Sequence, residues 1–367
     1  MGKGTQLGGN GEKTIAHNSE LLFIYDAKMC NPNGDPDDEN KPRMDYNRNV
    51  NLVSDVRLKR YIRDYLMDYK DETIFVSKVE GETVDATNRL KKLIEGYRAE
   101  IEAEENLKDL FEQNKPAEKN LSKHLQWLLS KLTDVRFFGS TMPLKSETGR
   151  GASITFTGPI QFNWGYSLNK VTGPMESSTI TSTFAGAGEE YSTMGKDYRV
   201  DYSVIAFHGI ISAKRAENTE LTDEDIDLFD DAMINAIPLE ATTRSKTGQS
   251  PLLYLRVEYN TPEFFAGDFR RYVKIVDKDG DGELSFDDTA KLRSTDDYKL
   301  DLTKLREKLE KHKGEIANIY FWKSEDLKIN GWELKNGEEW KCEYEENGTK
   351  KEKKIQIMEL PVPEKES

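Results

Sequence analysis

Residues 20–27 read ELLFIYDA, and the apolar run within them predicts a buried central β-strand. The residues that follow, NPNGDP at 31–36, contain two prolines and a glycine, so we expect an irregular loop that continues to Arg43. Ser54 is a good N-cap, and a helix is predicted from there to about Met67. The core therefore begins with a strand, a loop and a helix.

Three more strands and a second core helix are expected downstream. Residues 154–164 carry apolar side chains at alternate positions and predict a strand interrupted at Gly158, and 200–211 and 253–259 predict two others. A capped helix is expected to begin at Thr222. The order strand, helix, strand, strand, helix, strand is that of the ferredoxin-like fold of RNA recognition domains, which makes the predicted class α+β.

Two stretches do not fit this core and are expected to be insertions. Residues 71–120 are charged, with one apolar helical stripe, and an amphipathic helix from Leu121 to Leu132 follows them, so together they predict a helical subdomain. Residues 170–198 are rich in serine, threonine and glycine. This composition is compatible with a mobile surface loop or with a hairpin arm that contacts a neighbour or a ligand.

Composition limits the class of protein. The 367 residues are 36% hydrophobic and 33% charged, which favours one solvated core with insertions. No apolar run is long enough to cross a bilayer, the start of the chain is polar, and the two cysteines suggest no disulfide framework, so a cytoplasmic protein is predicted. The net charge of −14 argues against general attraction to nucleic acid, and any RNA site must be locally basic.

The helix that begins at Ser54 has two different faces. Its apolar residues recur at helical spacing and are expected to pack on the sheet: Leu58, Tyr61, Ile62, Tyr65 and Leu66. Its cations project to the other side: Arg57, Lys59, Arg60 and Arg63. Such a face is either a solvated surface or a phosphate-binding surface, and Lys41, Arg43 and Arg48 just upstream favour phosphate binding.

Residues 277–288 have the spacing of a calcium-binding loop, with five acidic side chains in the pattern: Asp277, Asp279, Asp281, Glu283 and Asp288. An aspartate replaces the usual glutamate at the last position, and a strand is expected at 272–276, just before the loop. A calcium site and an acidic turn without metal therefore both remain open.

Signs of catalysis are few. The four histidines lie in unrelated contexts, with none at metal-pair spacing. The acidic loop that contains Asp35 could hold a divalent ion for phosphodiester cleavage, although a proline-rich acidic loop is more often a solvated turn. The residues alone thus favour a binding protein that needs no cofactor.

Several segments resemble one known family. The run NPNGDPDDENKPRMD followed by LVSDVRLKRYIRDYL is similar to the start of the Cascade backbone subunits of CRISPR types I-B and I-C, the Cas seven family. DVRFFGS, TGPIQFNWGYSLNKV, MGKDYRVDY, HGIISA, TDEDIDLF and RSKTGQSPLLYLRVEY resemble later family blocks in the expected order, so the likeness covers roughly residues 20–260.

This resemblance implies a right-hand shape. The palm would be RRM-like and comprise 20–70 and 134–264, helical fingers would occupy 71–133, and a thumb hairpin would lie at about 170–199. A flexible tail at 1–19 and an extension at 265–367 would flank them. Family members polymerise along guide RNA without cleaving it, a neighbour's thumb kinking one nucleotide outward at intervals. The implied partners are crRNA, other copies of the chain, Cascade subunits of the Cas five, six and eight types, and target DNA through the guide.

The resemblance also implies a set of phosphate contacts: Asn31, Asn33, Arg43, Arg57, Lys59, Arg60, Arg63, Arg244 and Lys246. The candidate wedges on the thumb are Met175, Phe184 and Met194. A protein that accepts any guide cannot depend on base edges, and the aromatic signature of RNA recognition domains is missing, so bases are not expected to stack on the sheet. Two alternatives remain open: an RNA-cleaving relative of the type III proteins that uses Asp35, and a calcium-regulated binding protein.

Overall fold

The computed structural model describes residues 14–77, 85–142, 153–176, 180–185, 192–280, 282–346 and 349–361. The chain divides into two compact units. We call residues 18–62, 162–210 and 230–367 the sheet unit, and residues 1–17, 63–161 and 211–229 the helical unit. Within the described ranges, none of the helices combines the length and apolar character that a membrane span requires.

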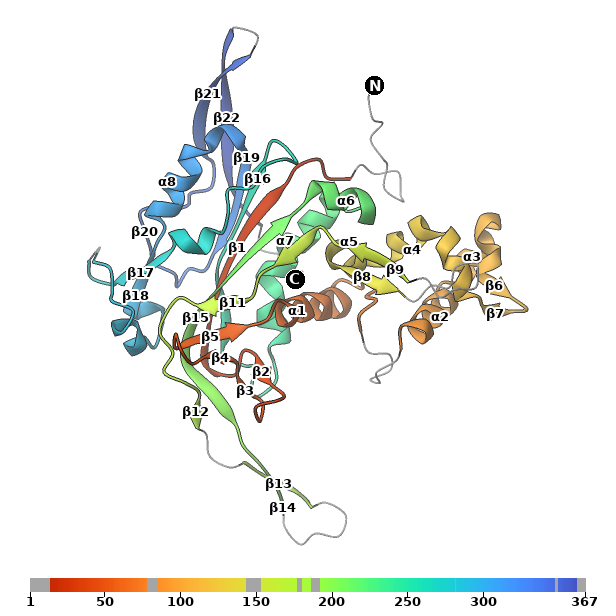
Figure 1. Ribbon diagram of the computed structural model, residues 1–367, viewed down its shortest axis with the longest axis horizontal. Coiled ribbons are helices and arrows are strands. Elements are labelled where there is room, and N and C mark those ends of the chain that lie inside the picture. The colour runs from red at the N-terminus through yellow and green to blue at the C-terminus, as the bar shows by residue number, and fades with distance from the viewer. Residues whose placement is uncertain are drawn as a thin grey trace, which may run out of the picture. The chain divides into compact units, whose positions relative to one another are not determined.

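A large mixed sheet dominates the sheet unit. Its path through the described strands is β21 (Glu338–Glu346), β22 (Thr349–Glu359), β19 (Ile316–Lys323), β16 (Gln249–Tyr259), β1 (Ser19–Cys30), β15 (Tyr198–Ile211), β11 (Gly165–Ser167), β5 (Val50–Val53) and β4 (Met44–Asp45). β10 (Ile160–Phe162) and β12 (Met175–Glu176) pair with β15. Figure 1 shows β1 between β15 and β16, and β22 runs parallel to β19 while the pairs β1–β16 and β16–β19 are antiparallel.

The strongest sequence patterns are confirmed. The apolar run at 20–27 lies in β1, and the strands predicted at 200–211 and 253–259 are β15 and β16. The two predicted core helices are α1 (Asp55–Tyr69) and α7 (Asp223–Glu240). Five consecutive side chains of β1, from Leu21 to Tyr25, are buried, so the strand is covered on both of its faces.

The strand predicted at 154–164 is wrong as a single element. β9 (Ile154–Thr157) pairs with β8 (Gly139–Met142) in a separate two-stranded sheet, whereas β10 joins the large sheet. The break has a steric cause, because a Cβ on Gly158 would lie 2.1 Å from the Phe138 carbonyl carbon, and one on Gly139 would lie 2.1 Å from the Phe156 oxygen. Only glycine allows this close backbone approach.

Two other local predictions also need correction. The loop after β1 contains a short ladder, since β2 (Gly34–Asp35) pairs with β3 (Lys41–Pro42) and residues Glu39 and Asn40 turn the chain with positive φ. The amphipathic helix predicted at 121–132 is divided into the 3₁₀ helix η2 (Glu118–Lys123) and the helix α4 (Leu125–Lys131). Periodicity located the buried residues of this segment correctly but not the breaks between its turns.

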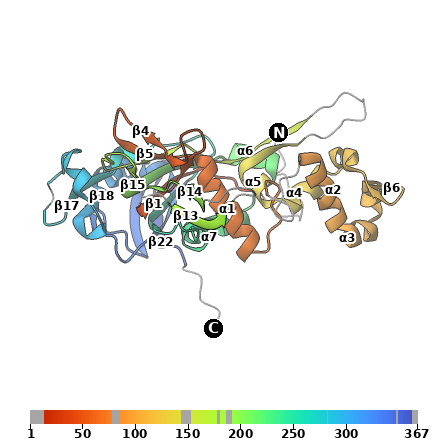
Figure 2. The ribbon, with the colours of Figure 1, turned by 90° about the horizontal axis from the view of Figure 1, so that it is seen from below.

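The helical unit has a core of its own. It contains α2 (Ala86–Gly96), α3 (Arg98–Ala103), the 3₁₀ helix η1 (Glu105–Leu110), the pair β6 (Phe111–Glu112) and β7 (Lys115–Pro116), α5 (Thr133–Phe138) and α6 (Ala213–Thr219). The predicted apolar stripe is buried at Leu90, Leu93, Ile94 and Ile101. Figures 1 and 2 both show α2, α3 and α4 side by side with β6, as expected for one packed insertion.

Part of the predicted N-terminal tail is bound to the helical unit. Residues 1–13 lie outside the described part of the chain. Thr14 forms a bridge with Thr222, and the Ile15 amide donates a hydrogen bond of 3.0 Å to the Leu221 carbonyl. This differs from the tail expected for residues 1–19, because β1 already begins at Ser19.

The C-terminal extension covers one face of the large sheet. It supplies β17 (Lys274–Asp277), β18 (Tyr298–Asp301), α8 (Thr303–Lys311) and β20 (Ile329–Asn330), and β17 confirms the strand expected at 272–276. Leu22 and Ile24 of β1 share a buried cluster with Phe269, Leu305 and Trp332 of the extension. The role that the sequence left open is therefore structural, because this segment completes the core.

The buried contact of the extension can be tested at Phe321 on β19, which is fully buried in that cluster. Phe321→Ala is expected to lower the free energy of unfolding by about 3–5 kcal/mol, because it leaves a cavity. Urea denaturation followed by circular dichroism measures the change. The exposed Glu325→Ala serves as the control. A loss below about 1 kcal/mol for Phe321→Ala would place the extension outside the cooperative core.

Candidate nucleic-acid interface

The loop that follows β1 is bound to the loop that precedes β16. Asn31 is 2% exposed, and its amide donates a hydrogen bond of 2.8 Å to the Ser245 carbonyl. Its side-chain Nδ2 donates to the Asn40 carbonyl over 2.7 Å. Lys246 Nζ donates to the Asn31 carbonyl over 2.6 Å. Asn31 and Lys246, which are 215 residues apart, thus belong to one site at the end of the central strand.

Asn33 connects this loop to helix α1. Its Oδ1 accepts hydrogen bonds from the Ser54 amide at 2.8 Å and from the Ser54 hydroxyl at 2.9 Å. Ser54 Oγ in turn accepts from the Arg57 amide at 3.3 Å, as the predicted N-cap should. Asn33 therefore positions the beginning of α1, and with it the first cation of the helix.

Arg57 and Lys246 form a partly buried cationic pair without a carboxylate. Burial, and then the positive charge of Arg57, lower the pKa of Lys246 to about 8. The Arg57 guanidinium lies 4.0 Å above the Tyr61 ring centroid. Neither cation forms an ion pair with any of the described residues. An anion placed here would relieve the repulsion that lowers the pKa of Lys246.

Several polar atoms at this site have no partner. Asn31 Oδ1, Arg57 Nε and Gln249 Oε1 are buried without a hydrogen bond among the described residues. Gln249 Nε2 donates to the Tyr61 hydroxyl at 2.9 Å, which places the glutamine beside the cationic pair. Buried polar groups are rarely left unsatisfied, so this cluster is incomplete without a bound water or ligand.

The remaining cations of the loop are paired with its acids. Arg43 Nη1 contacts Asp35 Oδ2 at 2.8 Å, and Lys41 Nζ contacts Asp38 Oδ1 at 2.7 Å. Asp35, the residue of the cleavage hypothesis, thus shares its carboxylate with a guanidinium. No cluster of three or more histidine, cysteine, aspartate or glutamate side chains that could hold a metal occurs in the described ranges.

Three of the predicted cations on α1 have restricted side chains. Lys59 is buried and lies 3.2 Å from Asp55 Oδ2, and Arg60 is partly buried. Arg63 belongs to the helical unit, where its Nε donates to Asp134 Oδ2 over 2.8 Å. Asp134 is fully buried and also accepts the amides of Phe75 and Val76 at 2.7 and 3.1 Å. Arg63 therefore holds a structural position, and we leave it out of the proposed contacts.

Arg199 is a component of the site that the sequence analysis missed. Its guanidinium donates to the Met29 carbonyl at 2.7 Å and to the Arg244 carbonyl at 3.2 Å, and it pairs with Asp197 at 2.8 Å. It thereby fixes the end of β1 against the loop that carries Arg244 and Lys246. Arg244 itself is exposed, with Nη1 3.3 Å from Asp197. The only available signal was the position of Arg199 in the block MGKDYRVDY.

Two of the three thumb candidates, Phe184 and Met194, lie on a β-hairpin. β13 (Ile180–Ala185) pairs antiparallel with β14 (Ser192–Gly195), and Figure 1 shows this pair projecting beyond β12. The pairing favours the hairpin arm over the mobile loop. Met175 on β12 is exposed. Phe184 and Met194 lie on β13 and β14, but their side chains fall outside the described ones.

Most carboxylates of the calcium-like loop already have partners. Asp277 accepts the Asp279 amide at 2.8 Å, and Glu283 pairs with Lys274. Asp288 accepts from Ser285 Oγ at 2.6 Å and contacts Lys291 Nζ at 2.8 Å. Asp281 lies outside the described residues. Calcium binding at 277–288 stays a prediction.

Comparison with known proteins identifies the family. Residues 17–303 match the family described as CRISPR-associated protein Cas7. The chain belongs to this family. A Haloferax volcanii protein of the same description is 33% identical over 320 residues, which span 84% of this chain and 87% of the relative. The predicted Cas seven membership is thus confirmed, while types I-B and I-C are not separated.

Two chains of solved structures align with most of this chain. A chain of "CRISPR RNA-guided surveillance complex, pre-nicking" aligns with a TM-score of 0.46, and one of "CRISPR RNA-guided surveillance complex" with 0.42. Both are 12% identical to this Cas7-family chain and cover 85% of it, and the alignments span 95% and 94% of those chains. Every predicted phosphate contact lies inside the Cas7 match, whereas β19, β21 and β22 lie beyond it.

The structural position of Arg63 can be tested by truncation. Arg63→Ala leaves Asp134 buried without its cation, and we expect it to lower the free energy of unfolding by about 3 kcal/mol or more. The exposed Arg215→Ala, in the same unit, should change it by less than about 0.5 kcal/mol. Chemical denaturation measures both variants. Equal stability of the two would show that the Asp134 pair does not support the helical unit.

Proposed function

We propose that this Cas7-family chain is a non-catalytic, crRNA-binding backbone subunit of a type I CRISPR surveillance complex (Cascade), of type I-B, that polymerises along the guide in antiviral defence. The observation that supports this most directly is the partly buried pair of Arg57 and Lys246, which has no carboxylate partner among the described residues. A sugar-phosphate chain supplies the anion that this pair lacks.

The proposed contacts do not depend on the guide sequence. Lys246 and Arg57 bind a phosphate, and Arg43 and Arg244 extend the positive surface along the strand. Asn31 and Asn33 hold the loop in place. The bases find no platform on the sheet, because the buried cluster around Leu22 and Ile24 is completed by the C-terminal extension. The affinity for the guide RNA therefore comes from contacts between these cations and the phosphates.

We further propose the palm, fingers and thumb of the family for this chain. β1, α1, β11, β15, α7 and β16 follow one another in the order strand, helix, strand, strand, helix, strand, which supports an RRM-like palm at 20–70 and 134–264. The helices at 71–133 form the fingers. The hairpin β13–β14 forms the thumb at 170–199, and Met175, Phe184 or Met194 wedges between nucleotides of a neighbour's guide.

The proposed partners follow from this role. They are crRNA, further copies of the chain in a helical filament, Cascade subunits of the Cas five, six and eight types, and target DNA paired with the guide. The complex would act in the cytoplasm without a cofactor. The ion pair between Asp35 and Arg43 supports a binding role over metal-dependent cleavage, because it occupies the carboxylate that would hold the metal.

Charge reversal tests the proposed site. Arg57→Glu combined with Lys246→Glu should abolish copurification of RNA and RNA-dependent oligomers, since two phosphate contacts become repulsive. The ratio of absorbance at 260 and 280 nm and size-exclusion chromatography measure these effects. Lys335→Glu, an exposed lysine of the sheet unit, is the matched control. Retained RNA with normal circular dichroism would refute the site, and regular cleavage of a complementary RNA in magnesium would refute the non-catalytic role.

RNA affinity should also depend on pH through Lys246. The pKa of this lysine is lowered to about 8 in the free protein, and a bound phosphate favours the charged form, so binding takes up a proton above about pH 8. Affinity should be constant near pH 7 and decrease by up to about tenfold per pH unit above pH 8. Fluorescence anisotropy with a labelled RNA measures it. Lys246→Arg stays charged and should remove the dependence, and an identical profile in both proteins would contradict the assignment.

A further inference from the structure

A second positively charged surface lies in the sheet unit, separate from the Lys246 site. It is a groove of about 730 Å³ beside β4, β5 and β11. Val50, Leu52 and Leu168 give it an apolar floor. Asp268, Arg270, Arg271 and Phe286 of the C-terminal extension form the facing wall. Nothing in the proposed guide-binding site uses these residues.

The groove carries a net positive charge, although the protein as a whole is acidic. Arg48, Arg270 and Arg271 line it with Asp45 and Asp268, and three cations against two carboxylates leave one positive charge. The Arg48 side chain is 81% exposed and only 3.6 Å from Asp45 Oδ2. The exposed Arg271 side chain makes no hydrogen bond or ion pair with the described residues. Arg271 is therefore available to an anionic ligand, and Arg48 can exchange its long, solvent-exposed ion pair with Asp45 for a phosphate, although the whole chain carries a net charge of −14.

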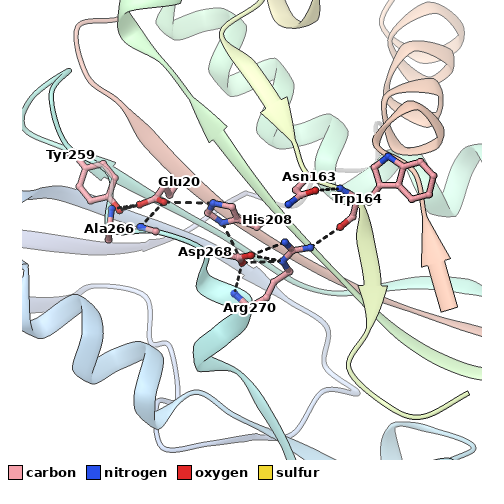
Figure 3. Close-up of polar contacts among 9 residues, drawn as sticks. Glu20, Asn163, Trp164, His208, Tyr259, Ala266, Asp268 and Arg270 are labelled. Carbon is pink, nitrogen blue, oxygen red and sulfur yellow. Dashed lines mark hydrogen bonds and ion pairs between the residues drawn. The ribbon is translucent and has the colours of Figure 1, made fainter. Parts of the chain in front are cut away.

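The third arginine builds the wall rather than binding a ligand. Arg270 is buried, pairs with Asp268 at 2.7 Å and donates to the Trp164 carbonyl at 2.7 Å. Figure 3 shows this group continuing through His208, whose ring nitrogens lie 4.0 Å from Asp268 and 3.6 Å from the buried Glu20. The Trp164 indole points away from the group. These contacts connect the wall to β1 and β15, so the groove is preformed.

Two aromatic side chains, Tyr166 and Phe286, line the groove together with the arginines. The Arg270 guanidinium lies 4.5 Å from the Tyr166 ring centroid, and Phe286 is 44% exposed. An exposed phenylalanine beside arginines offers a stacking surface within reach of two positive charges. Bases stack on aromatic and guanidinium planes without regard to their identity, and phosphates pair with arginine. The combination matches a nucleotide better than an aliphatic or purely acidic ligand.

We propose that this groove binds single-stranded nucleic acid, with phosphates on Arg48 and Arg271 and a base against Phe286 and Tyr166. The site is independent of the Arg57–Lys246 site and takes a strand other than the guide that occupies it. Binding shows little preference for sequence and is sensitive to salt, because it depends on contacts between arginines and phosphates and on stacking of bases. An acidic peptide is the other class of ligand that this charge admits, and the experiment separates the two.

The test uses the full chain as purified with its RNA and a fluorescent oligothymidylate of about 15 nucleotides that cannot pair with the guide. Arg48→Ala combined with Arg271→Ala is expected to weaken binding at least tenfold in fluorescence anisotropy. The slope of log affinity against log salt should decrease by about 1.4, the value for two phosphate contacts on a single strand. Phe286→Ala should weaken binding about fivefold or more. Lys335→Ala, the exposed control in the same unit, should leave binding unchanged.

Three results would overturn the proposal. Equal affinity of the double variant and the unsubstituted chain would show that the groove does not bind the strand. Loss of the copurifying RNA from the double variant would assign the groove to the guide path instead. Displacement of the oligonucleotide by polyglutamate more readily than by unlabelled oligothymidylate would indicate a protein surface.

The outcome is separable from that of the guide-binding proposal. If the chain purifies without RNA, guide binding fails, and the same titration with the RNA-free chain still tests the groove. In that case Arg57→Glu combined with Lys246→Glu should not change the affinity for oligothymidylate. If it abolishes binding, the groove is not an independent site.

Discussion

The burial of β1 on both faces is the constraint on which the rest of the structure depends. Leu22 and Ile24 share a cluster with the C-terminal extension, and Phe23 and Tyr25 on the opposite face contact Tyr254 and Phe207. A strand covered in this way can present polar groups only where it ends. The groups proposed to bind RNA therefore gather in the loops beyond Cys30, and the geometry of the loops determines which atoms face solvent.

The distribution of charge explains how an acidic chain can hold a polyanion. Most cations near the site have carboxylate partners, as in the pairs of Lys41 with Asp38, Arg43 with Asp35 and Lys59 with Asp55. Such pairs restrict the positive field to a short range. The cations at the end of β1, Arg57 and Lys246, lack a carboxylate among the described residues, and burial makes their repulsion stronger than it would be in water. A local deficit of negative charge thus coexists with a net charge of −14.

The sequence predicted those elements whose patterns are long and periodic. β1, β15, β16, α1 and α7 follow from apolar runs, alternation and capping residues, each of which acts over a few neighbouring residues. The interruption at Gly158 was predicted, but the assignment of its two halves to different sheets was missed, because it depends on a close approach to the backbone at Phe138. Helical periodicity placed Arg63 on an outward face, but Asp134, 71 residues further on, gives it a buried partner that no local pattern contains. The same limit applies to the candidate site, because contacts with Met29 and Asn31, which are distant in the sequence, fix the positions of Arg199 and Lys246.

The C-terminal extension, which is only partly inside the family match, packs beside both proposed ligand surfaces. β19 pairs with β16 and β22 pairs with β19, so these strands satisfy backbone groups that would otherwise form an exposed edge next to the core. The earlier part of the extension covers the sheet face that carries Leu22 and Ile24, and its residues Asp268, Arg270 and Arg271 line the groove beside β5. Closing the face and building the groove are consequences of the same packing. A chain that covers its sheet in this way leaves loops and edges for the proposed nucleic-acid contacts, where phosphates are reached more easily than base edges.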